Sequence, residues 1–190
     1  MKDNILQNFL KESYNANKKQ YVINIFNKVR DFIYQINWAT TIKKLLDIRE
    51  WYCVPKTRLL KACYDELAYE TKICFISFSF SFIDLPPHLM NWGYSKKPWY
   101  HVFLKIKIED KWIDVDSTWN KELDGTFWSN LEWNGLSSQK VVCNYHEYFV
   151  PQNESDEIRI KKELSNDYRL TEDDFKWIAE FNAYIKKISA

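Results

Sequence analysis

The spacing of hydrophobic residues predicts three helices in this chain. Between residues 18 and 37, apolar side chains recur every three or four positions, which is typical of an amphipathic helix with one buried face. A second helix is predicted to begin just after Cys53, because Pro55 suits the first helical turn and apolar residues follow at helical spacing. A third is predicted to begin near Thr171, whose hydroxyl together with Asp174 forms the pattern of a capping box.

Alternation of apolar and polar residues predicts three strands in the middle of the chain. Residues 73–82 place cysteine, isoleucine and phenylalanine on one face and serine on the other, as in a half-buried strand. Residues 100–108 and 112–115 alternate in the same way, and runs joined so closely indicate a β-hairpin. The other segments are predicted to be a long loop at 84–98, a turn-rich region at 117–135, a short strand at 141–143 and a polar surface segment at 151–166.

The order of these elements predicts an α+β fold, in which a helix packs against an antiparallel sheet and further helices lie toward both ends of the chain. A length of 190 residues suits one domain, and no repeat, low-complexity tract or linker divides the sequence. We therefore expect residues 1–190 to form a single domain, with 151–190 contributing the polar segment and the last helix.

Composition and charge exclude several classes of function. The three glycines, Gly93, Gly125 and Gly135, fit no Walker A loop, no dinucleotide-binding G-x-G-x-x-G and no G-x-S-x-G nucleophile elbow. A formal charge of +1 without a basic block gives no support for a nucleic-acid partner. The sequence shows neither a signal-peptide pattern nor a run of about 18 apolar residues, so we expect a cytoplasmic protein without a membrane partner.

The cysteines and histidines show no metal-binding pattern. The four cysteines include no C-x-x-C pair, and the three histidines lack ligand spacing as well. We therefore expect free thiols, as in a reducing compartment, with no metal and no cofactor.

Cys53 is a candidate nucleophile because it is predicted to lie where a helix begins. Unpaired backbone N–H groups and the helix dipole favour a thiolate there, and the thiolate is the reactive form of cysteine. Most free cysteines are instead small buried hydrophobic residues, so this position alone does not identify a catalytic group.

The predicted hairpin supplies a candidate base for this thiol. Alternation along residues 100–108 directs His101 away from the apolar face, to the side on which Asp114 and Asp116 of the second run lie. A turn centred on residues 108–109 sets Asp116 directly opposite His101, whereas a turn one residue later makes the two diagonal neighbours. Either register lets the carboxylate reach the imidazole, as the base of a thiol nucleophile requires. The other interpretation is a strand histidine tied to an acid for structural reasons.

These residues lie in motifs that resemble one enzyme superfamily. The motif YCVPK at residues 52–56, YH at 100–101 and KWIDVDST at 111–118, in this order, resemble the transglutaminase-like superfamily. They are most similar to its bacterial and archaeal transglutaminase-like domains of unassigned substrate. Softer matches extend the resemblance over a motif core of about residues 22–135. The resemblance implies a papain-like α+β fold.

The resemblance also implies roles for the candidate residues. Cys53 would be the nucleophile, His101 the general base and acid, and Asp116 the carboxylate that orients the imidazole, with Asp114 a bystander. The implied chemistry is attack on an amide or acyl carbonyl through a Cys53 thioester. An enzyme with this chemistry would be a hydrolase (a protease or deamidase) or an acyltransferase, and its substrate would be a protein or peptide.

The chain departs from the usual pattern beside these residues. Trp51 stands where relatives carry glycine, Thr57 where they often carry alanine, and residues 69–72 replace a Gly-Ile-Pro segment. In such a fold the Cys53 N–H would be one oxyanion donor. An indole N–H of Trp51 or Trp38 is the candidate for the second, although core packing is the commoner use of tryptophan. The alternative function is a catalytically inactive transglutaminase-like domain that binds a peptide or protein.

Overall fold

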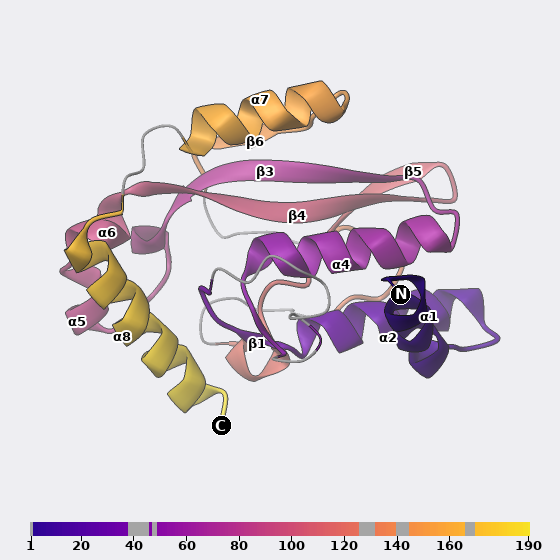
Figure 1. Ribbon diagram of the computed structural model, residues 1–190, viewed down its shortest axis with the longest axis horizontal. Helices are drawn as coiled ribbons and strands as arrows, with labels where there is room; N and C mark the ends of the chain where they lie inside the picture. The colour runs from indigo at the N-terminus through magenta and orange to yellow at the C-terminus, as the bar shows by residue number, and fades with distance from the viewer. Residues whose placement is uncertain (1, 38–45, 47–48, 126–131, 140–144, 166–169) are drawn as a thin grey trace.

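The chain forms an α+β fold around a four-stranded antiparallel sheet (Figure 1). The computed structural model describes residues 2–37, 46, 49–125, 132–139, 145–165 and 170–190. The strands are β1 (Ile33–Tyr34), β2 (Glu50–Trp51), β3 (Thr71–Ser79), β4 (Pro98–Ile108), β5 (Lys111–Val115) and β6 (Glu147–Phe149). The helices are α1 (Lys2–Ser13), α2 (Lys18–Arg30), α4 (Cys53–Glu66), α5 (Pro87–Met90), α6 (Gly93–Lys96), α7 (Glu154–Ser165) and α8 (Glu172–Ile188).

Two sheets hold the strands. The larger has the order β5-β4-β3-β6, and each neighbouring pair in it is antiparallel. The smaller pairs β1 with β2 in parallel, so that Tyr34 lies beside Trp51, two residues before the start of α4. The helix that carries Cys53 is therefore anchored by backbone pairing immediately before its first turn.

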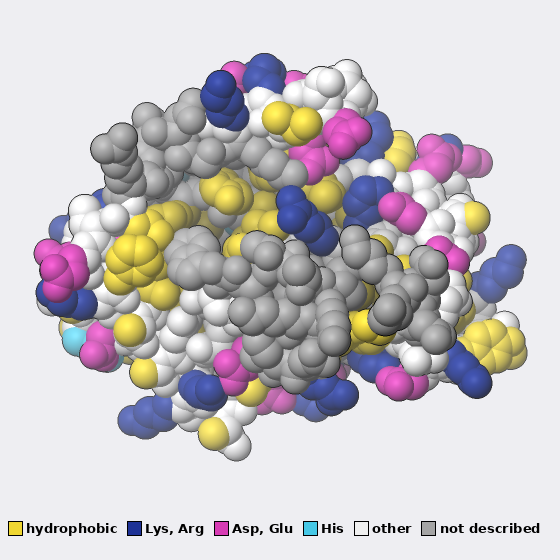
Figure 2. Space-filling view, in the orientation of Figure 1, with side chains coloured by type: hydrophobic (Ala, Val, Ile, Leu, Met, Phe, Trp, Pro, Cys, Tyr) yellow, Lys and Arg dark blue, Asp and Glu magenta, His cyan; other side chains and the backbone are white. Residues whose placement is uncertain are grey.

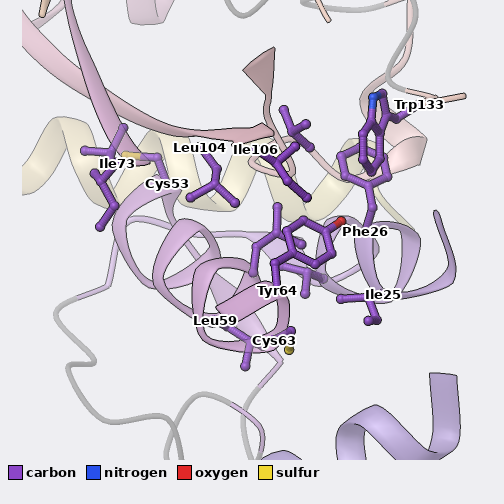
Figure 3. Close-up of a cluster of buried hydrophobic side chains, with 14 of the residues drawn as sticks. Ile25, Phe26, Cys53, Leu59, Cys63, Tyr64, Ile73, Leu104, Ile106 and Trp133 are labelled. Carbon is purple, nitrogen blue, oxygen red and sulfur yellow. The ribbon is translucent and has the colours of Figure 1, made fainter. Parts of the chain in front are cut away.

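Helix α4 runs along β3 and β4, and α2 packs against α4 (Figure 1). Leu104 and Ile106 of β4 share a buried cluster with Leu59 and Tyr64 of α4 and Phe26 of α2 (Figure 3). A second cluster lies on the opposite face of the sheet, where side chains of β3 meet α8. The predicted arrangement of a helix on an antiparallel sheet is confirmed.

Helix α2 ends at Arg30, so the predicted helix over residues 18–37 is too long. Residues 33–34 form β1 instead, because their backbone pairs with β2. The backbone N–H of Ile36 then donates to Asn182 Oδ1 of α8 at 2.9 Å. The apolar run is buried throughout most of its length, and burial alone does not distinguish a helix from an extended segment.

Strand β3 is buried on both faces, which corrects the prediction of a half-buried strand. Its serine side is covered, since Ser79 Oγ donates to the carbonyl of Ser95 in α6 at 2.7 Å. The same Oγ accepts the N–H of Ser81, and the strand ends there in a 3₁₀ turn over Phe80–Phe82. The alternation correctly predicted a strand, but the serine face that it predicted to be exposed is also buried.

The β4–β5 hairpin is confirmed, with the later of the two turns. Ile106 pairs with Ile113 and Ile108 with Lys111, leaving Glu109 and Asp110 as a two-residue turn. Both turn residues have positive φ, 47° and 65°, as the favoured hairpin turns require.

Other predictions have mixed outcomes. The capping box of Thr171 and Asp174 is confirmed at the start of α8, and the second helix begins at Cys53 as expected. The predicted loop at 84–98 contains α5 and α6, and the polar segment at 151–166 forms α7. The strand predicted at 141–143 lies outside the described residues.

The face shown in Figure 2 mixes charges of both signs. Lysine and arginine side chains are interspersed with aspartate and glutamate, and apolar side chains gather in a hollow near the middle. None of the described helices combines the length and the apolar character needed to cross a bilayer.

Lys56 joins three segments inside the fold. Its side chain is completely buried in the first turns of α4. The Nζ group donates to the carbonyls of Arg30 and Thr118, each at 2.8 Å, and to the carbonyl of Phe32. The three N–H groups of the ammonium thus have three carbonyl acceptors. The Arg30 carbonyl lies at the end of α2, where carbonyls have no partner within the helix.

We expect Lys56→Met to destabilise the protein by about 3 kcal/mol or more, because it leaves buried carbonyls without a donor. The free energy of unfolding from urea denaturation measures this change. Lys176→Met is the matched control: Lys176 lies 55% exposed on α8, and the cost there should stay below about 1 kcal/mol. Similar losses in the two variants would contradict the role given to Lys56.

Candidate active site

Cys53 is the first residue of α4, with Tyr52 as the N-cap. Its side chain is nearly buried, at 7% exposure. The first N–H groups of a helix have no partner within the helix, and the helix dipole adds positive potential at this end. The backbone N–H of Cys53 therefore belongs to a site that favours negative charge.

His101 and Asp116 form a buried pair on the neighbouring hairpin. His101 lies within β4, Asp116 directly follows β5, and the imidazole Nε2 is 2.7 Å from Asp116 Oδ2. The other carboxylate oxygen accepts the N–H of Thr118 at 3.0 Å. The backbone N–H of Asp116 donates to Gln139 Oε1 at 2.9 Å, which holds the backbone of Asp116 in place.

The protonation of His101 is governed by these neighbours. Burial lowers the pKa of His101, but the charge and hydrogen bond of Asp116 raise it, and a hydrogen bond and charge interaction with Cys53 raise it further, to about 10. Since Asp116 occupies Nε2, the nitrogen left for Cys53 is Nδ1. The imidazole ring thus lies between the Cys53 sulfur and the Asp116 carboxylate.

Cys53 and His101 both line a cavity of about 80 Å³. None of its described lining residues is a lysine, arginine, aspartate or glutamate. A mostly apolar wall of this kind strengthens electrostatic interactions at the Cys53 sulfur. Besides Cys53 and His101, the lining residues are Tyr34, Ile36, Tyr52, Val54, Phe78, Phe80, Tyr94, Trp99, Tyr100 and Trp119.

Thr57 joins α4 to β4 next to His101. Its buried hydroxyl donates to the carbonyl of Val102 at 3.0 Å. The helix that carries Cys53 and the strand that carries His101 are thereby joined by a hydrogen bond that alanine could not make.

The structure brings Cys53, His101 and Asp116 together, and it places the other candidates elsewhere. Asp114 pairs with Lys105 Nζ at 2.6 Å and accepts the hydroxyl of Tyr148 at 3.2 Å.

The indole candidates for the oxyanion site do not reach the cavity in the described structure. Trp51 is completely buried in the cluster around α2 and α4, with its ring 5.4 Å from that of Phe32. It is not among the described residues that line the cavity. Trp38 lies outside the described residues.

Two residues of the site gave no signal in the sequence. Tyr34 reaches the cavity from β1, which was predicted as part of a helix. Gln139 follows Asp116 by 23 residues, and no local pattern relates the two. Within the described part of the chain, no group of three or more His, Cys, Asp or Glu side chains could hold a metal ion.

Comparisons with known proteins found a structural similarity but no sequence match. No family model matches the chain, and no curated protein matches it. A crystal structure described as that of a "putative cysteine protease" from Cytophaga hutchinsonii is similar, with 17% sequence identity and a TM-score of 0.42. The match covers 78% of this chain and 50% of the other, so the chain spans about half the length of the structure that it matches.

We expect the stability contributed by His101 to fall as the pH rises from 6.5 to 10. The folded-state pKa of about 10 lies above the ordinary value of 6.5, so the contribution is complete below pH 6.5 and is lost as the pH rises through 10. The difference in free energy of unfolding between the wild type and His101→Gln should shrink by up to about 1.4 kcal/mol per pH unit in this window. Urea denaturation at a series of pH values measures it, and a constant difference would contradict the ion pair.

Proposed function

We propose that this protein is a cysteine-nucleophile enzyme that acts on peptide or amide bonds through a thioester on Cys53. The observation that carries the proposal is that Cys53 and His101 line one cavity while His101 is hydrogen-bonded to the buried Asp116 carboxylate behind it. A thiol at a helix N-terminus, a base next to it and a carboxylate behind the base are the parts that nucleophilic catalysis requires. The transglutaminase-like motifs of the sequence assign the same roles to the same residues.

Acylation begins from the thiolate of Cys53, which the His101 imidazolium stabilises. The sulfur attacks the substrate carbonyl carbon, and the carbonyl oxygen becomes an oxyanion. As the C–N bond breaks, His101 gives its Nδ1 proton to the leaving nitrogen, and the acyl group stays on sulfur as a thioester. Asp116 holds the imidazole in position and stabilises its charged form.

Deacylation uses the same residues in reverse. Neutral His101 takes a proton from the attacking water or amine, a bond forms to the thioester carbon, and the C–S bond breaks to restore the thiolate. Water gives hydrolysis or deamidation, whereas an amine gives transamidation. The apolar cavity favours a low-water site, because none of its described lining residues is a lysine, arginine, aspartate or glutamate.

The alternative is a binding module of the same fold without catalysis. An active enzyme differs from such a module by having one activated thiol. Burial raises the pKa of Cys63 and of Cys74 to about 12, so both stay protonated and unreactive at neutral pH. Cys53 has the histidine partner that these two buried thiols lack.

We expect iodoacetamide at low concentration and pH 7 to label Cys53 selectively, as read by peptide mass spectrometry. Cys53→Ala should abolish the labelling, and Cys74→Ala should leave it unchanged. His101→Ala should slow it by roughly 10²-fold or more, because the charge that stabilises the thiolate is lost. Labelling that falls on another cysteine, or a rate unchanged in His101→Ala, would contradict the proposal.

The type of reaction is read from incubation with a peptide library and a primary amine. Mass spectrometry distinguishes cleavage, a deamidation shift and an amine adduct, and each product must disappear in Cys53→Ala. A labelled Cys53 without any product under these conditions favours the binding module.

A further inference from the structure

The tetrahedral intermediate of the proposed reaction carries a negative oxygen that needs two donors. The backbone N–H of Cys53, at the start of α4, supplies one. A second donor must point into the cavity from another element, and it must keep its proton at neutral pH.

Tyr34 reaches this cavity from a position fixed relative to Cys53. It pairs in parallel with Trp51, two residues before the nucleophile, and the following N–H of Gln35 donates to the Trp51 carbonyl at 3.1 Å. The backbone N–H of Tyr34 also donates to Asn120 Oδ1 at 3.0 Å. The strand therefore holds Tyr34 and the start of α4 as one rigid unit.

The ring of Tyr34 is held as firmly as its backbone. Its centroid lies 4.3 Å from that of Trp119 and 6.1 Å, edge to face, from that of Phe181. Contacts on two sides leave little rotational freedom, so the direction of the hydroxyl is set before a substrate binds.

The hydroxyl of Tyr34 is free to donate. The residue is 5% exposed and lines the cavity, and within the described part of the chain its hydroxyl has no hydrogen-bond partner. Burial raises the pKa of Tyr34 well above its usual value, and the nearby charges of Cys53 and Asp116 raise it further. The group therefore stays protonated, and a hydroxyl at the cavity wall can donate to an acceptor brought by the substrate.

The other tyrosines of the cavity fit this role less well. Tyr94 is stacked between Trp99 and Trp177, each at 4.3 Å, and its pKa is raised by burial and Asp174 rather than by Cys53. Burial raises the pKa values of Tyr52 and Tyr100 and the charge of Cys53 raises them further, while Arg58 acts in the opposite direction. Of the four, Tyr34 alone is influenced by both the nucleophile and the carboxylate of Asp116.

We propose that Tyr34 is a catalytic residue. Its hydroxyl would be the second hydrogen-bond donor to the oxyanion that forms when Cys53 attacks a carbonyl. This inference rests on the proposed function. It assigns the oxyanion site to a phenol on β1 instead of the indole of Trp51.

The test compares two reactions of the same thiol in Tyr34→Phe. With p-nitrophenyl acetate, sulfur attacks the acetyl carbon, an oxyanion forms, and p-nitrophenolate leaves as the C–O bond breaks. With iodoacetamide, sulfur displaces iodide from a methylene carbon and no oxyanion forms at the amide. We expect the variant to slow acylation roughly 10²-fold and to leave the alkylation rate within about two-fold of wild type, since the thiolate is unchanged.

Tyr64→Phe is the matched control, because it removes a buried hydroxyl that donates to the Val22 carbonyl away from the cavity. Both reactions should keep their wild-type rates in that variant. Unchanged acylation in Tyr34→Phe, or equal slowing of both reactions, would overturn the role of Tyr34 while the proposed function stands. A wild-type Cys53 that neither reagent modifies would overturn both proposals.

Discussion

The ammonium group of Lys56 in α4 binds carbonyls of two other segments that are far apart in the sequence, and the site depends on the meeting of these three parts of the chain. Two of these carbonyls belong to Arg30 and Phe32, at and after the end of α2, and the third belongs to Thr118. Burial lowers the pKa of Lys56, whereas the charges of Asp116 and Asp31 act in the opposite direction. The same lysine that closes the core therefore lies within the electrostatic reach of the Asp116 carboxylate.

Thr118 links this lysine to the chemistry. Its carbonyl accepts from Lys56, while its backbone N–H donates to Asp116 Oδ1. One peptide segment thus connects the first turns of α4 to the carboxylate that is hydrogen-bonded to His101. The separation between Cys53 and the imidazole is set by a short chain of buried hydrogen bonds, to which the Thr57 hydroxyl adds a direct link between α4 and β4. Preorganisation of this kind is what a nucleophile and its base require.

Sequence patterns predicted the parts of the site that depend on local structure. Pro55 and the helical spacing placed Cys53 at a helix start, and alternation in the hairpin put His101 and Asp116 on one face. Only the turn was left open, because one residue of register changes Asp116 from the position opposite His101 to the diagonal. Tyr34 was assigned to a helix, since a two-residue strand is defined by its partner and has no periodicity of its own. The role of Gln139 could not be predicted either, because its hydrogen bond to the backbone of Asp116 joins residues 23 positions apart.

The departures from the transglutaminase-like pattern lie on the core side of the site. Trp51 fills the cluster between α2 and α4, and Thr57 uses its hydroxyl on the Val102 carbonyl. A bulky indole before the nucleophile is tolerated because β2 turns that side chain inward, whereas the partner strand directs Tyr34 into the cavity. The larger residues that stand in place of glycine and alanine therefore contact the core side of α4, and neither is among the described residues that line the cavity.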